Sequence, residues 1–241
     1  MADQRRFILQ VWKRVAGIFR EFGAIHGVLY AVDQVLRRLS PSCGVYPYEF
    51  YLQPIGDRPL LPPALLKTLS AERLAPGHAL LAVVPVPQPV LAARFAHGAQ
   101  AVVALRNAEP LGYAWWCKGT YQEQEVRCTF EVAASEAAVF DFDVYVLPAH
   151  RMGLGFMSVW HVFMEQLRDA GVTHSYSRIS AFNLASRRAH ARLGARVIGR
   201  AVFVRLGPLS LALTGRFPYA RAALGDGCGL RMRLDTQGVH G

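Results

Sequence analysis

The sequence predicts a mixed α/β fold, and three stretches of the chain carry this prediction. Residues 139–147 are apolar and β-branched like a buried strand, and a turn with two glycines and a run of helical spacing follow them. Residues 172–179 and 184–193 repeat the order of strand and helix. Residues 7–39 show helical periodicity over about nine turns before the first strand begins.

The composition is that of a globular protein with a large core. The chain has 241 residues, 52% hydrophobic and 18% charged, which excludes a disordered chain and fits one large domain or a domain with an appended segment. Its 27 lysines and arginines exceed 17 acidic residues, giving a net charge of +10 that favours phosphate groups, acidic lipids or acidic glycans as partners. No motif for DNA or RNA is visible, so nucleic acid is not expected.

The cysteine spacing and the length of the apolar runs exclude further classes of protein. Cys43, Cys117, Cys128 and Cys228 form no C-x-x-C pair, so we predict free thiols and no metal site. The charged start of the chain is not typical of a signal peptide, and no run of about 18 uncharged apolar residues occurs. We therefore expect a cytoplasmic protein without a transmembrane segment.

The stretch at residues 7–39 is typical of one helix or a helix pair, with Gly23 and Gly27 as candidate break points. Two interpretations are open. In one, its apolar side packs on the core and its arginines face water. In the other, a basic amphipathic surface rests on anionic lipid at the inner face of the membrane.

The middle of the chain is predicted to form strands and a hairpin. Residues 45–55 alternate and are rich in aromatics, as in a strand, and a proline-rich loop leads to a short helix at 64–74. Residues 99–106 and 111–118 form an antiparallel hairpin, and 127–133 is compatible with another strand. Four aromatic residues could line a cleft or pack in the core: Tyr113, Trp115, Trp116 and Tyr121.

The turn after residues 139–147 has the composition of an anion site. Pro148 ends the strand, and Gly153 and Gly155 allow a ligand to approach the backbone where a helix begins. A tight turn that binds nothing explains the glycines equally well. No G-x-G-x-x-G and no G-K-S/T is present, so neither a dinucleotide fold nor a P-loop is predicted.

Two motifs in order carry a family resemblance. P-x-H-R-x-G-x-G at 148–155 and N-x-x-S-x-x-x-H-x-x-x-G-A at 183–195 each follow a predicted strand. Over residues 139–206 this order resembles the GNAT superfamily of acyl-CoA-dependent N-acyltransferases. The resemblance implies a central, mostly antiparallel sheet with a splayed parallel pair and helices on both faces.

The resemblance also implies cofactor contacts to acetyl-CoA or another acyl-CoA. The residues concerned are Val146 and Leu147 for the pantetheine arm, Arg151, Met152, Gly153, Leu154 and Gly155 for the pyrophosphate, and Asn183 and Ser186 of the second motif. His190 stands where the family often has a tyrosine proposed to protonate the leaving thiolate. An imidazole can serve as that acid, or it can simply pack on the sheet.

Direct transfer to an amine needs a proton acceptor beside the thioester. Asp141 and Asp143 fall on the same side of the strand alternation, and either could take the proton, with Asp143 preferred because it is nearer the turn. Both could instead be solvated or paired with arginines. A backbone N–H near Leu147 is the expected oxyanion donor. Cys117 and Cys128 have no recognisable histidine partner, so a covalent intermediate is not expected.

Together these features predict an N-acyltransferase, with acetyl as the expected group and a small-molecule amine or envelope-related amino sugar as acceptor. The alternatives are a non-catalytic acyl-CoA-binding module and a membrane-surface enzyme using long acyl chains. An anionic membrane surface and a second copy of the chain are the further partners that the sequence allows. We divide the chain into a helical extension at 1–40, a GNAT-like domain at 41–210 and a tail at 211–241, disordered beyond Leu234.

Overall fold

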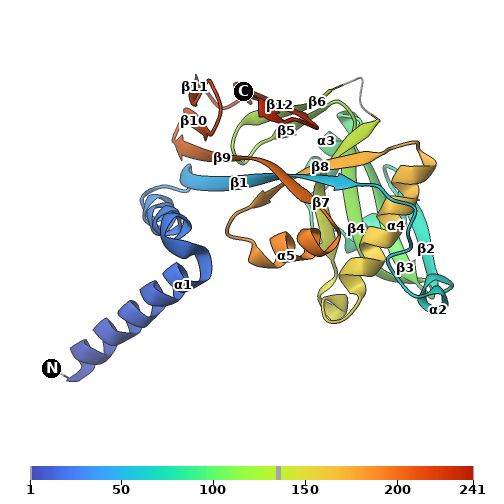
Figure 1. The fold of residues 1–241 in the computed structure, drawn as a ribbon, viewed down its shortest axis with the longest axis horizontal. Helices are drawn as coiled ribbons and strands as arrows, with labels where there is room; N and C mark the ends of the chain where they lie inside the picture. The colour runs from blue at the N-terminus through green and yellow to red at the C-terminus, as the bar shows by residue number, and fades with distance from the viewer. Residues whose placement is uncertain (1, 134–136, 241) are drawn as a thin grey trace.

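The computed structural model describes residues 2–133 and 137–240, and the side chains of residues 2–16, 18 and 21 are not described. These residues form a large and a small sheet with helices around them (Figure 1). In spatial order the nine-stranded sheet contains β11 (Ala220–Leu224), β10 (Leu209–Thr214), β9 (Arg196–Leu206), β1 (Cys43–Pro54), β8 (His174–Ser180), β7 (Ala138–Val146), β4 (Glu109–Cys117), β3 (Gln100–Arg106) and β2 (Leu69–Leu74).

The nine-stranded sheet is antiparallel except for the pair β7 and β8. The predicted fold class is therefore confirmed. The small sheet has the order β13 (Gly238–His240), β12 (Leu230–Asp235), β6 (Cys128–Val132) and β5 (Thr120–Glu123). The helices are α1 (Ala2–Leu39), α2 (Pro63–Leu66), α3 (Gln88–Ala96), α4 (Gly155–Asp169) and α5 (Leu184–Arg192), with short 3-10 turns η1 (Ala79–Val83) and η2 (Pro148–His150).

Helices and the small sheet cover opposite faces of the large sheet. On one face, α4 buries Trp160, Phe163 and Leu167 against Trp116 and Val139. On the other face, α3 covers β3 and β4, and the small sheet covers the centre. Burial of such large apolar side chains, about 1.5–3 kcal/mol each, holds the layers together. The face under α4 and the face under α3 are therefore separate environments.

The kink that the sequence placed at Gly23 or Gly27 lies at Gly23, where φ is +77° and the backbone leaves the helical region. A residue without a Cβ adopts this conformation without strain. Beyond the kink, α1 packs on β1, and its buried Asp33 accepts hydrogen bonds from the Val45 N–H (2.9 Å) and from Arg37 Nε (2.8 Å).

Several sequence predictions were wrong in detail. Residues 64–74 form only one turn of helix before the edge strand β2. The strand at 196–206 is not the last, because β10 and β11 extend the same sheet. The segment after Leu234 is paired as β13 with β12, so the disorder expected there is absent up to His240. Long-range pairing of this kind has no local sequence signal.

Candidate functional site

The candidate site is built around a gap between β7 and β8. The two strands pair from Ala138 opposite His174 to Asp141 opposite Ser177 and no further, although both strands continue. The splayed parallel pair implied by the family resemblance is therefore present. Each strand offers one unpaired edge to the gap beyond Asp141.

A β-bulge in β7 coincides with the point where the strands separate. Trp115 of β4 lies opposite Asp143 and Trp116 lies opposite Asp141, which leaves Phe142 as the extra residue. A bulge bends its strand, and we attribute the separation of β7 from β8 to it. The bulge also reverses the alternation of side chains along β7.

Beyond the bulge, the backbone N–H and C=O groups of every second residue of β7 point into the gap. Leu147 N–H donates to the Leu111 carbonyl across β4 at 2.9 Å, so Leu147 is not free to act as the oxyanion donor that we expected. In an antiparallel ladder the alternate residues point to the other edge, which here are Val144 and Val146. The Val146 carbonyl indeed accepts from Arg151 Nε at 3.1 Å.

The turn before α4 uses both glycines for its own geometry. Gly153 has φ of +82°, and a Cβ on Gly155 would stand 2.0 Å from the His150 carbonyl oxygen. Leu154 at the N-cap gives no side-chain hydrogen bond to the helix, and the first helical bond is Ser158 N–H to the Leu154 carbonyl at 2.9 Å. The amides that precede this bond form the open, positive end of the helix dipole.

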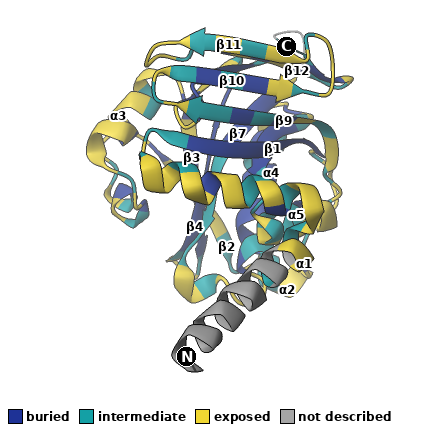
Figure 2. Cartoon of the chain, turned by 90° about the vertical axis from the view of Figure 1, so that its left-hand side faces the viewer, coloured by how far each residue is buried: buried dark blue, intermediate teal, exposed yellow. Residues whose placement is uncertain are grey.

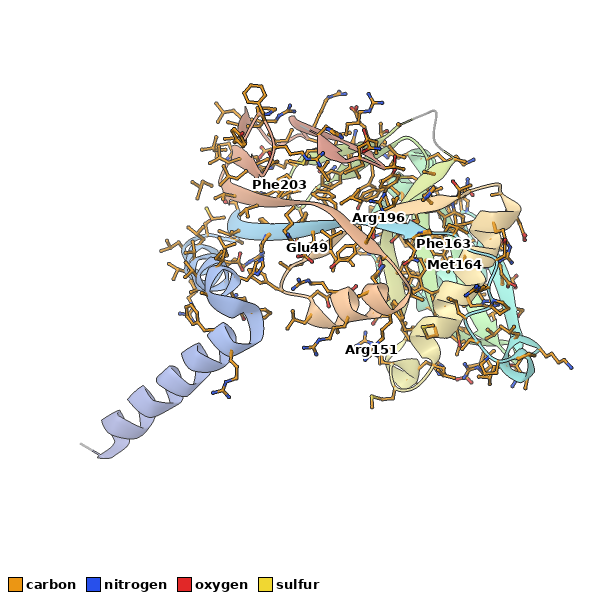
Figure 3. The ribbon with its side chains drawn as sticks, viewed as in Figure 1. Glu49, Arg151, Phe163, Met164, Arg196 and Phe203 are labelled. Atoms are coloured by element: carbon orange, nitrogen blue, oxygen red, sulfur yellow. The ribbon has the colours of Figure 1, made fainter. Side chains whose placement is uncertain are left out.

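The side chains of the turn point in different directions. Met152 is 89% exposed, whereas the Arg151 guanidinium lies over the Tyr145 ring at 5.0 Å (Figure 3). Stacking and the bond to the Val146 carbonyl fix this arginine at the entrance of the gap. His150 lies 3.5 Å from Glu109 and therefore faces β4 instead.

The second motif begins α5. Asn183 Oδ1 accepts a hydrogen bond from Ser186 N–H at 3.0 Å, which is an N-cap. Both residues were expected to contact the cofactor, and the cap gives them a structural use. It leaves the Asn183 NH2 group as the part that a ligand could meet.

His190 is buried between the two helices and β1. Its ring lies 5.0 Å from the Trp160 ring, 6.0 Å from Phe156 and 5.9 Å from Tyr51. Burial lowers the His190 pKa to about 4, so the ring is neutral at pH 7 and has no acidic proton to give. The premise for His190 as an acid, an imidazolium near neutral pH, is therefore not met.

Three buried polar atoms near the gap have no hydrogen-bond partner in the described part of the chain. They are His190 Nδ1, Trp160 Nε1 and Ser177 Oγ. Atoms of this kind also occur away from the gap, such as Trp115 Nε1 on the α3 side and Ser210 Oγ of β10, so they do not by themselves identify a binding site. The two sequence motifs thus lie side by side, with aromatic side chains packed between them.

The two aspartates of β7 lie on opposite faces, contrary to the prediction. Asp141 is opposite Trp116, which packs under α4, and Asp143 is opposite Trp115, which packs under α3. The bulge at Phe142 causes the reversal. Side chains alternate between the two faces of a sheet only while the ladder is unbroken, and one extra residue moves every later side chain to the other face.

Asp141 is the titratable group at the base of the gap. The residue is 4% exposed, and its carboxylate accepts a hydrogen bond from Ser175 Oγ at 2.6 Å. Burial raises the pKa of Asp141 to about 7, with the Ser175 hydrogen bond and the charge of Arg178 acting against the rise. A carboxyl with this pKa changes its charge at neutral pH.

A cavity of about 330 Å³ opens on the opposite face, under α3. Phe142, Tyr121 and Cys117 give it apolar walls, and Arg94 and Glu123 give it charge. Arg94 bonds Asp143 at 2.8 Å, which ties this aspartate to the cavity wall. The bulge residue therefore separates the gap on one face from a cavity on the other.

Of the four aromatic residues predicted to line a cleft or pack in the core, Tyr121 lines this cavity. The other three are buried in the packing: Tyr113 on Tyr145, Trp115 on Phe95 and Trp116 on Phe163. Packing is thus the main use of these residues.

A buried charge cluster that sequence reasoning missed lies beside α5. Glu49 of β1 is 1% exposed and accepts from Tyr51 Oη (2.7 Å), Arg187 Nε (2.7 Å) and Arg200 Nε (2.9 Å) (Figure 3). Burial alone would raise the Glu49 pKa, but these bonds and the Arg187 charge lower it. The single acid in the aromatic run 45–51 was the available signal, but its two arginine partners are remote in sequence.

The two buried thiols of Cys117 and Cys128 are not activated, and the described residues contain no cluster of metal ligands. Burial raises the pKa of Cys117 to about 12 and raises that of Cys128 as well, so neither thiol is a ready nucleophile at neutral pH. Within residues 2–133 and 137–240, no three His, Cys, Asp or Glu side chains gather as a metal site would require. None of the helices in these ranges is both long and apolar enough to cross a bilayer.

No protein-family model and no curated protein matches this sequence. Among solved structures, the chain is similar to a tandem GNAT protein from the clavulanic acid biosynthesis pathway, with 17% identity and a TM-score of 0.47 over 67% of this chain and 53% of that one. It is similar to a GCN5-related N-acetyltransferase from Sphaerobacter thermophilus, with 15% identity and a TM-score of 0.48 over 75% of this chain and 56% of that one.

A GCN5-related N-acetyltransferase from Kribbella flavida is similar at 15% identity and a TM-score of 0.40, over 75% of this chain and 63% of that one. The chain thus spans less than two thirds of the length of these three proteins. A likeness at such identities and TM-scores concerns the fold and identifies neither the activity nor the acceptor of this chain.

Proposed function

We propose that this chain is an acyl-CoA-dependent N-acyltransferase. The group transferred is acetyl in the first place, and it passes directly from CoA to an amine of a small molecule or an envelope-related amino sugar. The observation that carries the proposal is the gap between β7 and β8, with an open helix start at its mouth and a separate cavity behind its wall. Two reactants can thereby approach one strand from opposite faces.

The residues at the gap fit a long, phosphate-ended thioester. The amides around Gly153 and Gly155 would hold a diphosphate, and the free edge of β7 at Val144 and Val146 would pair with an extended amide-bearing arm. When bound, the thioester supplies an activated acyl group; the chain supplies position and proton transfer.

Asp141 is our candidate for the proton acceptor. Because its pKa is about 7, it can take a proton from an ammonium group at neutral pH and release it again. Asp143, held by Arg94 at the cavity wall, is our candidate for positioning the acceptor. The raised thiol pKa values of Cys117 and Cys128 favour direct transfer over a covalent acyl-enzyme.

A second candidate is an acyl-CoA-binding module without catalysis. His190 favours it, because a neutral ring enclosed by Trp160 and Phe156 cannot act as the acid that the family pattern suggests. Tight CoA binding without thiol release over a broad panel of amines would favour this module. Thiol release that depends on an added amine would favour the enzyme.

A thermal-shift series with CoA, acetyl-CoA and palmitoyl-CoA tests the binding site. A ligand at about 100 times its Kd adds about 2.7 kcal/mol to the folded state, which raises the Tm by about 5–10 °C for a chain of this size. No shift with any of the three compounds would contradict the proposal. A larger shift with palmitoyl-CoA would instead favour the long-chain alternative.

The variant Leu154→Asp separates a phosphate site from a mere turn. A carboxylate at the start of α4 interacts well with the helix dipole, so the apo protein should gain about 0.5 kcal/mol of stability. The same charge repels a diphosphate, so the Kd for CoA should rise roughly tenfold or more. Leu154→Asn, which adds no charge, is the matched control. Unchanged CoA affinity in Leu154→Asp would place the pyrophosphate elsewhere.

A further inference from the structure

The cavity under α3 has an apolar interior and a polar mouth. Apart from two charged residues, its buried and half-buried lining residues are Ala99, Cys117, Tyr121 and Phe142. Its exposed polar lining residues are His97, Thr120, Gln122 and Gln124. Figure 2 shows α3, which forms one wall, as a largely exposed helix at the side of the molecule. The volume of about 330 Å³ is at the small end of the roughly 300–1,000 Å³ that ligand sites in proteins span.

The apolar wall of the cavity is held rigidly. Tyr121 stacks on Phe142 with 4.4 Å between ring centroids and on Phe140 with 5.1 Å. Phe142 also packs against the buried clusters on this face of the large sheet. A fixed aromatic wall of this kind suits an apolar side chain, and it offers hydroxyl groups few partners.

Two ion pairs carry the charge around the cavity. Arg94 Nη1 donates to Asp143 Oδ2 at 2.8 Å, and Arg178 Nε donates to Glu123 Oε2 at 2.7 Å. Two positive and two negative groups therefore balance each other. Burying a ligand with a net charge beside them costs free energy, because no opposite charge is left to pair with it. The balance favours a ligand that is neutral as a whole.

The Arg94–Asp143 pair leaves hydrogen-bonding groups of both kinds free. Arg94 uses Nη1 alone, and its Nε and Nη2 groups have no acceptor among the residues that the structure describes. Asp143 uses Oδ2 alone, and its Oδ1 has no donor within the same residues. The guanidinium is held over the Trp115 ring at 5.0 Å and the Phe142 ring at 5.2 Å. Both charged side chains are partly exposed, 19% and 24%, so a ligand can reach them.

An α-amino acid is the complement of this pair. Its ammonium and carboxylate groups are bonded to one carbon atom, and its net charge is zero. A guanidinium with free donors binds a carboxylate strongly, and a carboxylate oxygen such as Oδ1 of Asp143 accepts from an ammonium group. The side chain of the amino acid is then free to lie along the apolar wall of the cavity.

We propose that the amine acceptor is an α-amino acid with an apolar side chain, held by Arg94 through its carboxylate and by Asp143 through its ammonium group. The inference rests on the proposed function and names the amine of that reaction. In the transfer an amide bond forms between the amino acid nitrogen and the acyl carbon, and the C–S bond of the thioester breaks. The ammonium group loses two protons, of which one ends on the CoA thiol and the other in solvent. An amino sugar lacks the carboxylate and brings hydroxyl groups that the apolar interior leaves unpaired.

Acetyl transfer to matched acceptors tests the proposal. L-Phenylalanine and L-leucine carry both charged groups, 2-phenylethylamine lacks the carboxylate, and glucosamine carries hydroxyl groups in place of the apolar side chain. With acetyl-CoA, kcat/KM should be at least about tenfold higher for the two amino acids, because a site with donors for a carboxylate discriminates against a ligand that leaves them unpaired. Faster transfer to 2-phenylethylamine or to glucosamine would overturn the acceptor class and leave the N-acyltransferase standing.

Calorimetric titration of the protein with L-phenylalanine in the presence of CoA needs no turnover, so it separates this inference from the proposed function. Transfer to other amines without binding of L-phenylalanine would overturn the acceptor class alone. Binding of L-phenylalanine without transfer to any amine would contradict the proposed function and support the amino acid site as a binding site.

The variant Arg94→Gln identifies the carboxylate contact. The KM for L-phenylalanine should rise about tenfold or more, because its carboxylate loses the guanidinium. The KM for 2-phenylethylamine should stay unchanged or fall, since this amine has no carboxylate and meets one positive charge fewer. Arg73→Gln, which removes an exposed arginine of β2 bonded to Gln166, is the matched control and should keep both KM values. An equal rise for both acceptors in Arg94→Gln would overturn the carboxylate contact.

The variant Ala93→Trp tests the cavity itself. Ala93 is an exposed lining residue of α3, so an indole there projects toward the cavity without replacing a packed side chain. The KM for L-phenylalanine should rise at least about tenfold, while the thermal shift with CoA should persist and show that the variant is folded. Wild-type kinetics in both Arg94→Gln and Ala93→Trp would place the acceptor elsewhere and overturn the proposal.

Discussion

Asp141 and Asp143 stand two residues apart on β7, yet they belong to different chemical environments. Asp141 is buried on the α4 side, hydrogen-bonded to Ser175, with a pKa near 7. Asp143 lies on the α3 side with a side chain 24% exposed and a guanidinium at 2.8 Å. The bulge at Phe142 is the sole reason that the two carboxylates do not share a face.

The difference shows that environment, and not spacing in the sequence, divides the roles of these carboxylates. Burial raises the pKa of Asp141, whereas Asp143 is held in place by the Arg94 guanidinium at 2.8 Å. Proton transfer then belongs on the gap side of β7 and acceptor placement on the cavity side. Each of the following experiments compares the two sides.

The largest effect is expected in the pH dependence of stability of Asp141→Asn. An unfolded aspartate titrates near pH 3.9, whereas Asp141 in the folded state titrates at about 7. Between these values the unfolded chain ionises and the folded chain does not, so the wild type loses stability as the pH rises. Asparagine does not titrate. The stability of the variant relative to wild type should therefore rise by about 3 kcal/mol from pH 4 to pH 7.

Urea unfolding at a series of pH values measures this difference. Asp143→Asn is the matched control, since it makes the same substitution next to Arg94 on the other face. The free energy of unfolding of Asp143→Asn should fall by about 1 kcal/mol, because the partly exposed ion pair with Arg94 is removed. A stability difference between Asp141→Asn and wild type that does not change with pH would mean that the Asp141 carboxyl is solvated in the folded protein. The contrast between the two faces of β7 would then disappear.

His190→Phe should show the opposite pH dependence on the gap side. Its folded pKa of about 4 lies below the ordinary value of 6.5, so on acidification the unfolded ring takes up a proton first. The wild type therefore loses stability as the pH falls through this window, and the variant does not. The variant should gain about 3 kcal/mol relative to wild type by pH 4.

A phenyl ring fits the aromatic surroundings of His190 and removes its unpartnered Nδ1. NMR titration of the histidine ring gives the pKa independently. A measured pKa near 6.5 would restore His190 as a candidate acid and weaken the assignment of proton transfer to Asp141.

The sequence was sufficient for the elements that carry a strong local pattern. The strands and helices at 139–193 and the hairpin at 99–118 were predicted from periodicity and turn residues, and the structure has them as β7, α4, β8, α5, β3 and β4. The position of the break in α1 was narrowed to two glycines. In each of these cases the sequence pattern that predicts the feature lies within the element itself or within a few residues of it.

The misses share a different cause. The alternation that put Asp141 and Asp143 together failed at Phe142, because a bulge is a property of two paired strands. The arginine partners of Glu49 lie 138 and 151 residues away. The position of β1 between β8 and β9 likewise leaves no local pattern in the sequence. Leu147 was expected to present a free N–H, but its pairing with Leu111 depends on the same long-range ladder.

The smallest and most direct test is the catalytic comparison of Asp141→Asn with Asp143→Asn. If Asp141 accepts the proton, its amide variant should lose about 100-fold in kcat with an acetyl-CoA and amine pair, with little change in KM for either. If Asp143 positions the acceptor, its variant should raise the amine KM about tenfold and leave kcat and the KM for acetyl-CoA near wild type. Thiol release measured at saturating acetyl-CoA separates the two parameters.

The pH profile adds a readout that a loss of packing would not imitate. In the wild type kcat should fall below about pH 7 as Asp141 becomes protonated, and this limb should disappear in Asp141→Asn but persist in Asp143→Asn. Asp141→Glu, which keeps the carboxyl, should keep the limb even if its rate is lower. Were the limb instead lost in Asp143→Asn, the acid–base group would lie on the cavity side, and the gap beside Asp141 would serve binding alone.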